Sequence, residues 1–275
     1  MIISTSQEIT MRLPATSAPL PCPAKATLTS LPVRQIHHLH PASETAAALR
    51  CTSCLLSAFC LPEGLSREDI EKLDAVVSVR RTVRRGHALY RTDDPFENIY
   101  AVRAGSFKSL LFNPDGREQV MSFQIAGELL GLDGLSMQKH ACDAIALEDS
   151  QVCVIPFHRL EALCHDIPGI QHMVHQFLGE EIARERRLLM VLGNMRAEER
   201  LASFILDLSD RLTERGYSSR EFHLRVTREE IGNYLGLKME TVSRIFSRFQ
   251  DAGFIELQQK LIRIVDIDGL RSVLA

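Results

Sequence analysis

The chain has 275 residues, of which 45% are hydrophobic and 24% are charged, and its formal net charge is −3. This is the composition of a globular protein long enough for two domains, and no apolar run approaches the length that spans a bilayer. The net negative charge excludes a uniformly basic surface for nucleic acid, although one domain can still carry a local basic face. The N-terminus shows no basic-then-apolar secretory signal. We therefore expect a cytoplasmic protein with no membrane partner, whose seven cysteines are not a disulfide framework.

Residues 1–47 are rich in Pro, Ser, Thr and Ala, as in "LPATSAPLPCPAKATLTSLP", and show few periodic apolar positions. Such a composition buries too little apolar surface to offset the entropy of ordering the chain, so it predicts a disordered N-terminal extension. The pattern changes at "SREDIEKLDAVV", which predicts a short helix with Ser66 as its N-cap and Asp69 in the capping-box position.

Residues 79–157 alternate short runs that are typical of strands with glycine-containing turns. The spacing of Ile99, Ala101 and Arg103 predicts a strand with one buried face. The glycines that recur at turn spacing are Gly86, Gly105, Gly116, Gly127, Gly131 and Gly134. This region therefore predicts an antiparallel barrel or roll.

Helical patterns dominate from residue 158 onwards. We expect a short helix over 158–167, a long helix over about 169–193, and an amphipathic helix in "RAEERLASFILDLSDRLTERG" that Gly216 ends. The remainder combines further helices with a strand pair in "FIELQQKLIRIV". A roll, then a long helix, then a small winged unit makes an α+β fold, and this order is typical of regulatory proteins rather than enzymes.

The stretch "TREEIGNYLGLKMETVSRIFSRFQDAGFIEL" predicts a helix-turn-helix: Thr227 caps a first helix, Gly236 supplies the turn, and a second helix starts near Lys238. From 218 to 250 there are six Lys/Arg against four acidic residues, so this unit is locally basic. The candidate DNA-contacting residues on the second helix are Glu240, Ser243, Arg244 and Arg248. Arginine, glutamate and serine are side chains that read base edges and bind phosphates in double-stranded DNA. The alternative is a plain three-helix packing unit with solvated charges.

Three cysteines follow the spacing C-x2-C-x5-C, at Cys51, Cys54 and Cys60. This spacing fits neither a zinc ribbon nor a ferredoxin run, but one further thiolate would complete a tetrahedral ligand set. Spacing alone leaves Cys142, Cys153 and Cys164 open as the fourth ligand. The apolar residues inside the segment, Leu55, Leu56 and Phe59, are interpreted as a shield that limits the access of oxidants.

The segment "AEERLASFILDLSDRLTERGYSSREFHLRVTREEIGNYLGLKMETVSRIFSRFQ" resembles the C-terminal part of the CRP/FNR superfamily of bacterial transcription regulators. The likeness extends through "NIYAVRAGSFKS" and "AGELLGLD" to the cysteine cluster, and it is strongest to the oxygen-sensing FNR branch. It implies an iron–sulfur-binding loop with a cyclic-nucleotide-binding-like β-roll sensor domain over 48–168, a dimerisation helix over 169–196, and a winged helix-turn-helix DNA-binding domain over 197–275.

The resemblance also assigns roles to single residues. Glu240, Ser243 and Arg244 match the family's base-reading positions, which implies a TTGAT-type half-site in an inverted repeat. The strand ending "VCVIPF" implies Cys153 as the fourth ligand of a 4Fe-4S cluster, whereas Cys22, Cys142 and Cys164 have no counterpart. Gly127 and Glu128 match part of the family's cyclic-nucleotide motif, but no Arg-Ser or Arg-Thr pair follows, so no cyclic nucleotide is expected. The turn "FNPDGRE" is a candidate contact for RNA polymerase.

A heptad-like reading of the long helix places Ile182, Leu189 and Leu192 on one seam together with Glu185. In a parallel homodimer Glu185 would face its own copy, and the repulsion between the two carboxylates would make the dimer marginal unless an intact cluster supports it. The alternative is that Arg184 or Arg186 neutralises Glu185 and the dimer is constitutive.

These observations predict an oxygen-responsive transcription regulator that binds DNA as a homodimer and controls genes of low-oxygen metabolism. Two alternatives stay open. One is a CRP-like regulator with structural zinc, haem or another effector, and the other is an iron–sulfur electron carrier. The sequence shows no substrate-binding glycine loop and no nucleophile–base pair.

Overall fold

The computed structural model describes residues 51, 54, 56–61, 65–77, 79–113 and 115–274. The extension predicted over 1–47 and Leu55 lie outside the described residues. None of the helices within the described ranges is long and apolar enough to cross a membrane.

In the part of the chain that the structure describes, two short helices precede the first strand. Helix α1 spans Ser57–Cys60 and α2 spans Arg67–Val76. The predicted cap of α2 is confirmed: the Ser66 side chain accepts a hydrogen bond from the Asp69 backbone, and the Asp69 side chain accepts one from the Ser66 backbone. Leu73 and Val76 on one face of α2 are buried, as helical periodicity requires.

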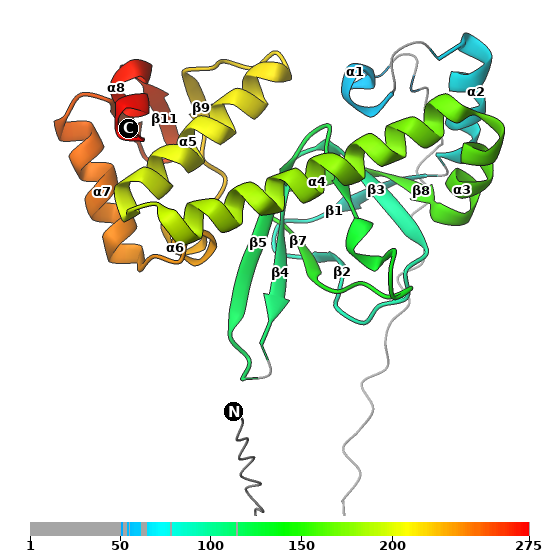
Figure 1. The fold of residues 1–275 in the computed structure, drawn as a ribbon, viewed down its shortest axis with the longest axis horizontal. Helices are drawn as coiled ribbons and strands as arrows, with labels where there is room; N and C mark the ends of the chain where they lie inside the picture. Colours follow the sequence, from blue (N-terminus) through cyan, green and yellow to red (C-terminus); the bar gives the residue numbers. More distant parts are fainter. Residues whose placement is uncertain are drawn as a thin grey trace, which may run out of the picture. The chain divides into compact units, whose positions relative to one another are not determined.

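Eight strands form the predicted antiparallel roll (Figure 1). They are β1 (Val79–Val83), β2 (Ala88–Tyr90), β3 (Asn98–Ala104), β4 (Ser106–Phe112), β5 (Glu118–Ile125), β6 (Leu129–Leu130), β7 (Asp143–Ala146) and β8 (Ser150–Pro156). They pair into two four-stranded sheets, in the orders β1-β8-β3-β6 and β2-β7-β4-β5. The side chains between the sheets, such as Tyr100, Val102 and Phe107, make the core of the roll.

The prediction that β3 has only one buried face was wrong. Ile99, Tyr100, Ala101 and Val102 are all buried. Tyr100 and Val102 belong to the core of the roll, whereas Ile99 packs on the opposite face among side chains of the following helices. A strand covered on both sides has no polar face, so alternation cannot reveal it.

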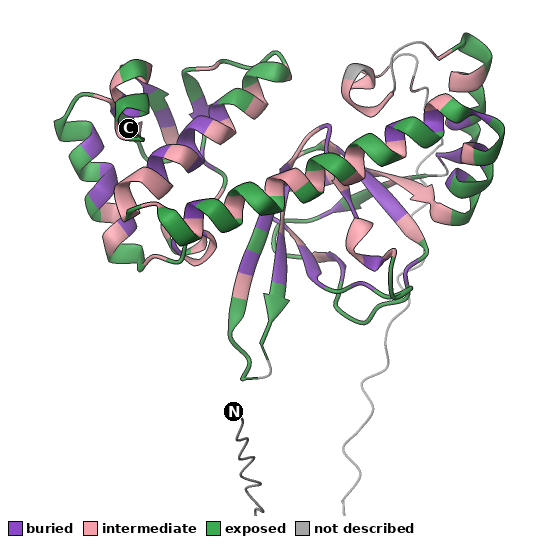
Figure 2. Cartoon of the chain, in the orientation of Figure 1, coloured by how far each residue is buried: buried purple, intermediate pink, exposed green. Residues whose placement is uncertain are grey.

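Three helices follow the roll. They are α3 (Phe157–Asp166), α4 (Pro168–Asn194) and α5 (Ala197–Glu214), close to the predicted ranges. The first turns of α4 bury Ile170 and Met173, but its middle is largely exposed (Figure 2). Helix α5 ends at Glu214 with Arg215 as its C-cap, and Gly216 follows with a φ of +78°.

The C-terminal unit consists of β9 (Glu221–His223), α6 (Arg228–Leu235), α7 (Met239–Asp251), β10 (Ile255–Gln258), β11 (Leu261–Ile264) and α8 (Ile267–Ser272). The predicted strand pair is confirmed as β10 and β11, and the unpredicted β9 adds a third strand beside β11. Leu201 and Ile205 of α5 share one core with Ile231 of α6 and Phe246 of α7. Helix α5 is therefore an integral part of the winged unit.

Candidate thiol site and candidate nucleic-acid interface

Four thiols from two distant parts of the chain line one cavity of about 70 Å³: Cys51, Cys54, Cys60 and Cys153. Apart from Ser57, the other lining residues are apolar, among them Leu73 of α2, Ile99 of β3 and Phe177 of α4. Cys153 is fixed by its position on β8, where it lies opposite Arg80 of β1 and Ala101 of β3. Neither Cys142 nor Cys164 lines this cavity.

The surroundings of Cys51, Cys60 and Cys153 oppose loss of their protons. Burial raises the pKa of Cys51 above its ordinary value, and the Asp74 carboxylate raises it further. Burial raises the pKa of Cys60 to about 12 and also raises that of Cys153. The Cys51 backbone N–H donates to Asp74 of α2 at 2.5 Å, which ties the start of the segment to that helix. A positive charge at the cavity would favour the thiolates, because it offsets the cost of burying them.

Among the residues that the structure describes, no three Cys, His, Asp or Glu side chains are gathered closely enough to hold a single metal ion. One zinc ion binds its sulfur ligands at about 2.3 Å and so requires closely packed thiols. The four thiols surround a cavity instead, and this arrangement suits a sulfur-ligated group larger than one ion. The donor set itself, four cysteines in an apolar setting, fits an iron–sulfur cluster.

Phe59 does not line the thiol cavity, so the interpretation that it shields the thiols is not supported by its position. Its ring lies on the outer side of α1, where the centroid is 5.1 Å from Cζ of Arg215. Leu61 does line the cavity, from the position directly after Cys60. Sequence reasoning had no signal for this orientation, because it depends on a contact with a residue far along the chain.

The helix-turn-helix has the local features that the sequence predicts. The Thr227 side chain accepts a hydrogen bond from the Glu230 backbone at 3.1 Å, and the Thr227 backbone donates to Glu230 at 2.7 Å. Gly236 ends α6 with a φ of +65°, a conformation that glycine adopts without steric cost. Helix α7 then starts after Lys238.

One face of α7 is buried and the other is open. Val242, Ile245 and Phe249 pack inward. The candidate DNA-contacting residues point away from that core: Glu240, Arg244 and Arg248 are exposed and Ser243 is partly exposed. Arg244 donates to the Thr241 hydroxyl at 3.2 Å, and Arg248 forms an ion pair with Glu198. The exposed face thus presents hydrogen-bond donors and acceptors on a rigid helix, as major-groove recognition requires.

Comparisons with known proteins agree with both the roll and the helix-turn-helix unit. The cyclic nucleotide-binding domain family matches residues 80–166, and the Crp-like helix-turn-helix domain family matches residues 199–273. The chain is 45% identical over 227 residues to the transcriptional regulatory protein btr of Bordetella pertussis, covering 82% of this chain and 94% of that protein. The chain belongs to the CRP/FNR family of transcription regulators.

Further comparisons place this CRP/FNR protein in the FNR-type branch. It is 39% identical to the anaerobic regulatory protein of Haemophilus influenzae, over 81% of this chain and 87% of that protein. Among solved structures it is similar to FixK2 from Bradyrhizobium japonicum, with a TM-score of 0.67 and 28% identity, over 72% of this chain and 98% of that one. The resemblance, the fold class and the expectation of a regulator rather than an enzyme are therefore confirmed.

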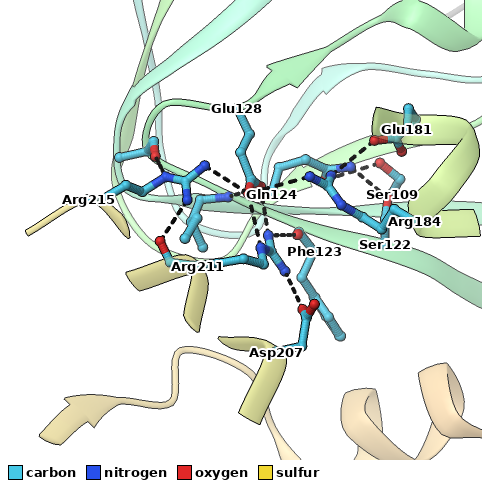
Figure 3. Close-up of polar contacts among 12 residues, drawn as sticks. Ser109, Ser122, Phe123, Gln124, Glu128, Glu181, Arg184, Asp207, Arg211 and Arg215 are labelled. Carbon is cyan, nitrogen blue, oxygen red and sulfur yellow. Dashed lines mark hydrogen bonds and ion pairs between the residues drawn. The ribbon is translucent and has the colours of Figure 1, made fainter. Parts of the chain in front are cut away.

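In this CRP/FNR protein the Gly127–Glu128 turn is occupied by contacts within the chain (Figure 3). The Glu128 carboxylate is 5% exposed and forms ion pairs with Arg211 at 2.6 Å, Arg215 at 3.1 Å and Arg184 at 3.7 Å. Burial opposes ionisation of Glu128, but the arginines hold its pKa below its ordinary value. The glutamate that matches the cyclic-nucleotide motif therefore binds α5 and α4 instead. Sequence reasoning missed these three partners because no local pattern links them.

The seam residues of α4 differ among themselves. Ile182 is 50% exposed and Leu189 is 69% exposed, and Glu185 is exposed between them. Leu192 is only partly exposed, and its carbonyl accepts a hydrogen bond from Arg200 at 2.8 Å. Arg184 is engaged with Glu181 of its own chain at 3.0 Å. Arg184 also lies 3.7 Å from Glu128 and thus points toward its own roll.

The strands of the β4–β5 hairpin pack on α6. Lys108 forms an ion pair with Glu230 at 2.8 Å, and the Asn233 side chain accepts from the Val120 backbone at 2.5 Å and donates to the Glu118 carbonyl at 2.9 Å. The residues of the predicted "FNPDGRE" turn that the structure describes are exposed. The strands of the hairpin are therefore docked on α6, whereas the side chains of the described turn residues are exposed.

Proposed function

We propose that this CRP/FNR protein is an oxygen-responsive transcription regulator. In this proposal it binds a palindromic TTGAT-type site on double-stranded DNA as a homodimer while a 4Fe-4S cluster is intact, and it controls genes of low-oxygen metabolism. The observation that carries the proposal is the convergence of Cys51, Cys54, Cys60 and Cys153 on one apolar cavity. The names of its relatives, anaerobic regulatory protein and transcriptional activator protein FnrA, support it.

The four cysteines would hold the cluster, and their thiolates are the ligands that iron–sulfur clusters use. The bound cluster would supply an oxygen-labile link between a short segment and a strand. Cys153 is the fixed member of the set, because β8 is hydrogen-bonded to strands on both sides. The segment with the other three thiols is tied to α2 through Asp74 and to the cavity wall through Leu61. Loss of the cluster would leave the segment with these weaker contacts alone.

The recognition helix would read the DNA site from its exposed face. Arg244 suits bidentate hydrogen bonds to guanine, Glu240 accepts from the cytosine amino group, and Ser243 serves either base. Arg248 is placed one turn further along α7 and would contact phosphate. A homodimer would present two copies of this helix to the two halves of an inverted repeat.

Dimerisation would use the exposed apolar side chains of α4. Ile182 and Leu189 are large, exposed and on one face of the helix, so pairing would remove them from water. Glu185 would meet its copy at the same seam, and the engagement of Arg184 with Glu181 and Glu128 leaves that repulsion uncompensated by Arg184. The exposed tip of the β4–β5 hairpin would contact RNA polymerase.

The test is anaerobic purification followed by exposure to air. We expect coloured protein whose visible absorption and iron content fall together in air, with a parallel loss of dimer and of affinity for the TTGAT palindrome. Absorption spectra, iron analysis, sedimentation and fluorescence anisotropy measure the four quantities. Colourless, iron-free protein that still binds the palindrome as a dimer overturns the proposal, as does colourless protein that contains zinc.

The proposed seam has its own test. We expect Glu185→Ala to yield a dimer that persists in air, because the carboxylate repulsion is gone. Glu180→Ala, an exposed glutamate of the same helix away from the seam, is the matched control and should behave as the unmodified protein does. Sedimentation in air measures both, and a monomeric Glu185→Ala protein contradicts the repulsion argument.

A further inference from the structure

We propose that Arg215 couples the thiol segment to the DNA-binding helices within a single chain, with Phe59 as its cover. Arg215 is the C-cap residue of α5, and its side chain is 8% exposed. It reaches back to the roll beside Glu128 and Arg211 (Figure 3). This inference rests on the proposed function, because it assumes that an intact cluster holds the thiol segment in the docked position.

The Arg215 guanidinium joins the roll to α5 by three hydrogen bonds. It donates to the Ala126 carbonyl at 2.6 Å, to Glu128 at 3.1 Å and to the Arg211 carbonyl at 2.6 Å. Ala126 and Glu128 belong to the β5–β6 turn of the roll, whereas Arg211 belongs to α5. Charge-assisted bonds of this kind are stronger where water is excluded.

Phe59 of α1 closes the remaining side of this guanidinium. Its ring centroid lies 5.1 Å from Cζ of Arg215, within the range of a cation–π contact. Gly127 makes room for the contact: a Cβ atom there would lie 3.2 Å from both Cβ of Phe59 and Nε of Arg215. The backbone of Gly127 also has a φ of +89°, which residues with a side chain rarely adopt. The ring, the glycine and the guanidinium are therefore closely packed against one another.

The same carboxylate that binds Arg215 also fixes the rest of α5. Arg211 donates to both oxygens of Glu128, at 3.0 and 2.6 Å, and to the Phe123 carbonyl at 2.7 Å. Helix α5 shares its core with α6 and α7, so its attachment to the roll positions the recognition helix. Departure of Phe59 would admit water to Arg215 and loosen this attachment. A change at the thiols would thus alter the position of α7 without any change in dimerisation.

The test compares Phe59→Leu with Phe59→Tyr in the full chain, kept anaerobic. Phe59→Leu keeps apolar bulk but loses the ring, and we expect the dimer to bind the palindrome about three- to tenfold more weakly, with iron content and dimer fraction unchanged. Phe59→Tyr keeps the ring and should restore the affinity. Backbone hydrogen exchange in residues 209–216 should be faster in Phe59→Leu only.

Arg215→Lys and the double variant complete the experiment. If the coupling holds, Arg215→Lys weakens binding and Phe59→Leu adds nothing to it, since both changes break the same contact. Additive effects, or a Phe59→Leu protein with unchanged or tighter DNA binding, overturn the inference. The iron content and air response of the unmodified protein are recorded separately, so failure of the proposed function is recognised independently of this result.

Discussion

Helix α7 buries Val242, Ile245, Phe246 and Phe249 in a core that it shares with α5 and α6, whereas none of the described side chains of α1 is fully buried (Figure 2). The DNA-reading element is thus folded by its own apolar contacts. The thiol segment is held by a few contacts to α2, to Arg215 and to the wall of a cavity. The difference suggests how the two regions can be coupled. A stably folded recognition helix can be regulated by a segment that has few stabilising contacts of its own, if a bound group supplies the missing stability.

The largest effect is expected at the thiols. Cys153→Ser should abolish iron binding, because loss of a direct ligand exceeds the roughly 10- to 100-fold cost of losing an outer-shell partner. Cys164→Ser is the matched control, since Cys164 lies on α3 outside the cavity. Iron per chain after anaerobic purification measures both. A full complement of iron in Cys153→Ser would contradict the assigned ligand set.

Glu128 and its three arginine partners, Arg184, Arg211 and Arg215, connect the roll to α4 and α5. Removal of the Glu128 carboxylate should have the next largest effect. Glu128→Gln leaves buried arginines without their carboxylate and should lower the free energy of unfolding by about 3 kcal/mol at neutral pH. Because the folded pKa of Glu128 is lowered, its contribution is complete above the ordinary glutamate value of about 4.3 and is lost as the pH falls further. Denaturation at several pH values should therefore show a difference that shrinks below about pH 4. A pH-independent difference would exclude the ionised carboxylate as its source.

Substitutions on the exposed face of α7 should weaken DNA binding without any change in the thiol segment. Arg244→Ala should weaken specific DNA binding by about 1–3 kcal/mol and relax the preference at one base pair, with iron content unaffected. Arg67→Ala removes an exposed arginine from α2 and should change neither quantity. Anisotropy with the palindrome and single-base variants measures the effect. A uniform loss over all sequences would assign Arg244 to phosphate instead.

The smallest effects are expected at the helix caps, because both regions contain the same capping box. Ser66 and Thr227 each form a capping box, and replacement of either by alanine should cost about 1 kcal/mol. Thr227→Ala should weaken DNA binding, because α6 supports the recognition helix. Ser66→Ala should instead speed the loss of absorption in air, since α2 carries Asp74. Identical phenotypes would show that the two regions are not separable.

Local rules explain how much of the fold and site could be predicted from the sequence. The caps at Ser66 and Thr227 and the turn at Gly236 follow from interactions between near neighbours, and all three were predicted. Three of the thiols share one segment, so their spacing revealed them. Cys153 required the family resemblance, because only the pairing of β8 with β1 and β3 brings it to the others.

The features that the sequence did not predict depend on contacts between residues far apart in the chain. The burial of β3 on both faces depends on helices that come later in the chain, and alternation carries no information about them. The partners of Glu128 come from α4 and α5, and Phe59 turns toward Arg215 through a contact between distant residues. β9 escaped prediction because a three-residue strand with one buried side chain, Phe222, has too little pattern.

The place of Cys153 on a strand between two others sets the order in which this site can be made. During synthesis on the ribosome, Cys51, Cys54 and Cys60 emerge long before β8, and they meet the fourth sulfur only after β8 has inserted between β1 and β3. In the proposed function, a donor that delivers iron and sulfide would therefore act only after the roll has folded. Assembly of the cluster would then depend on correct pairing of β8.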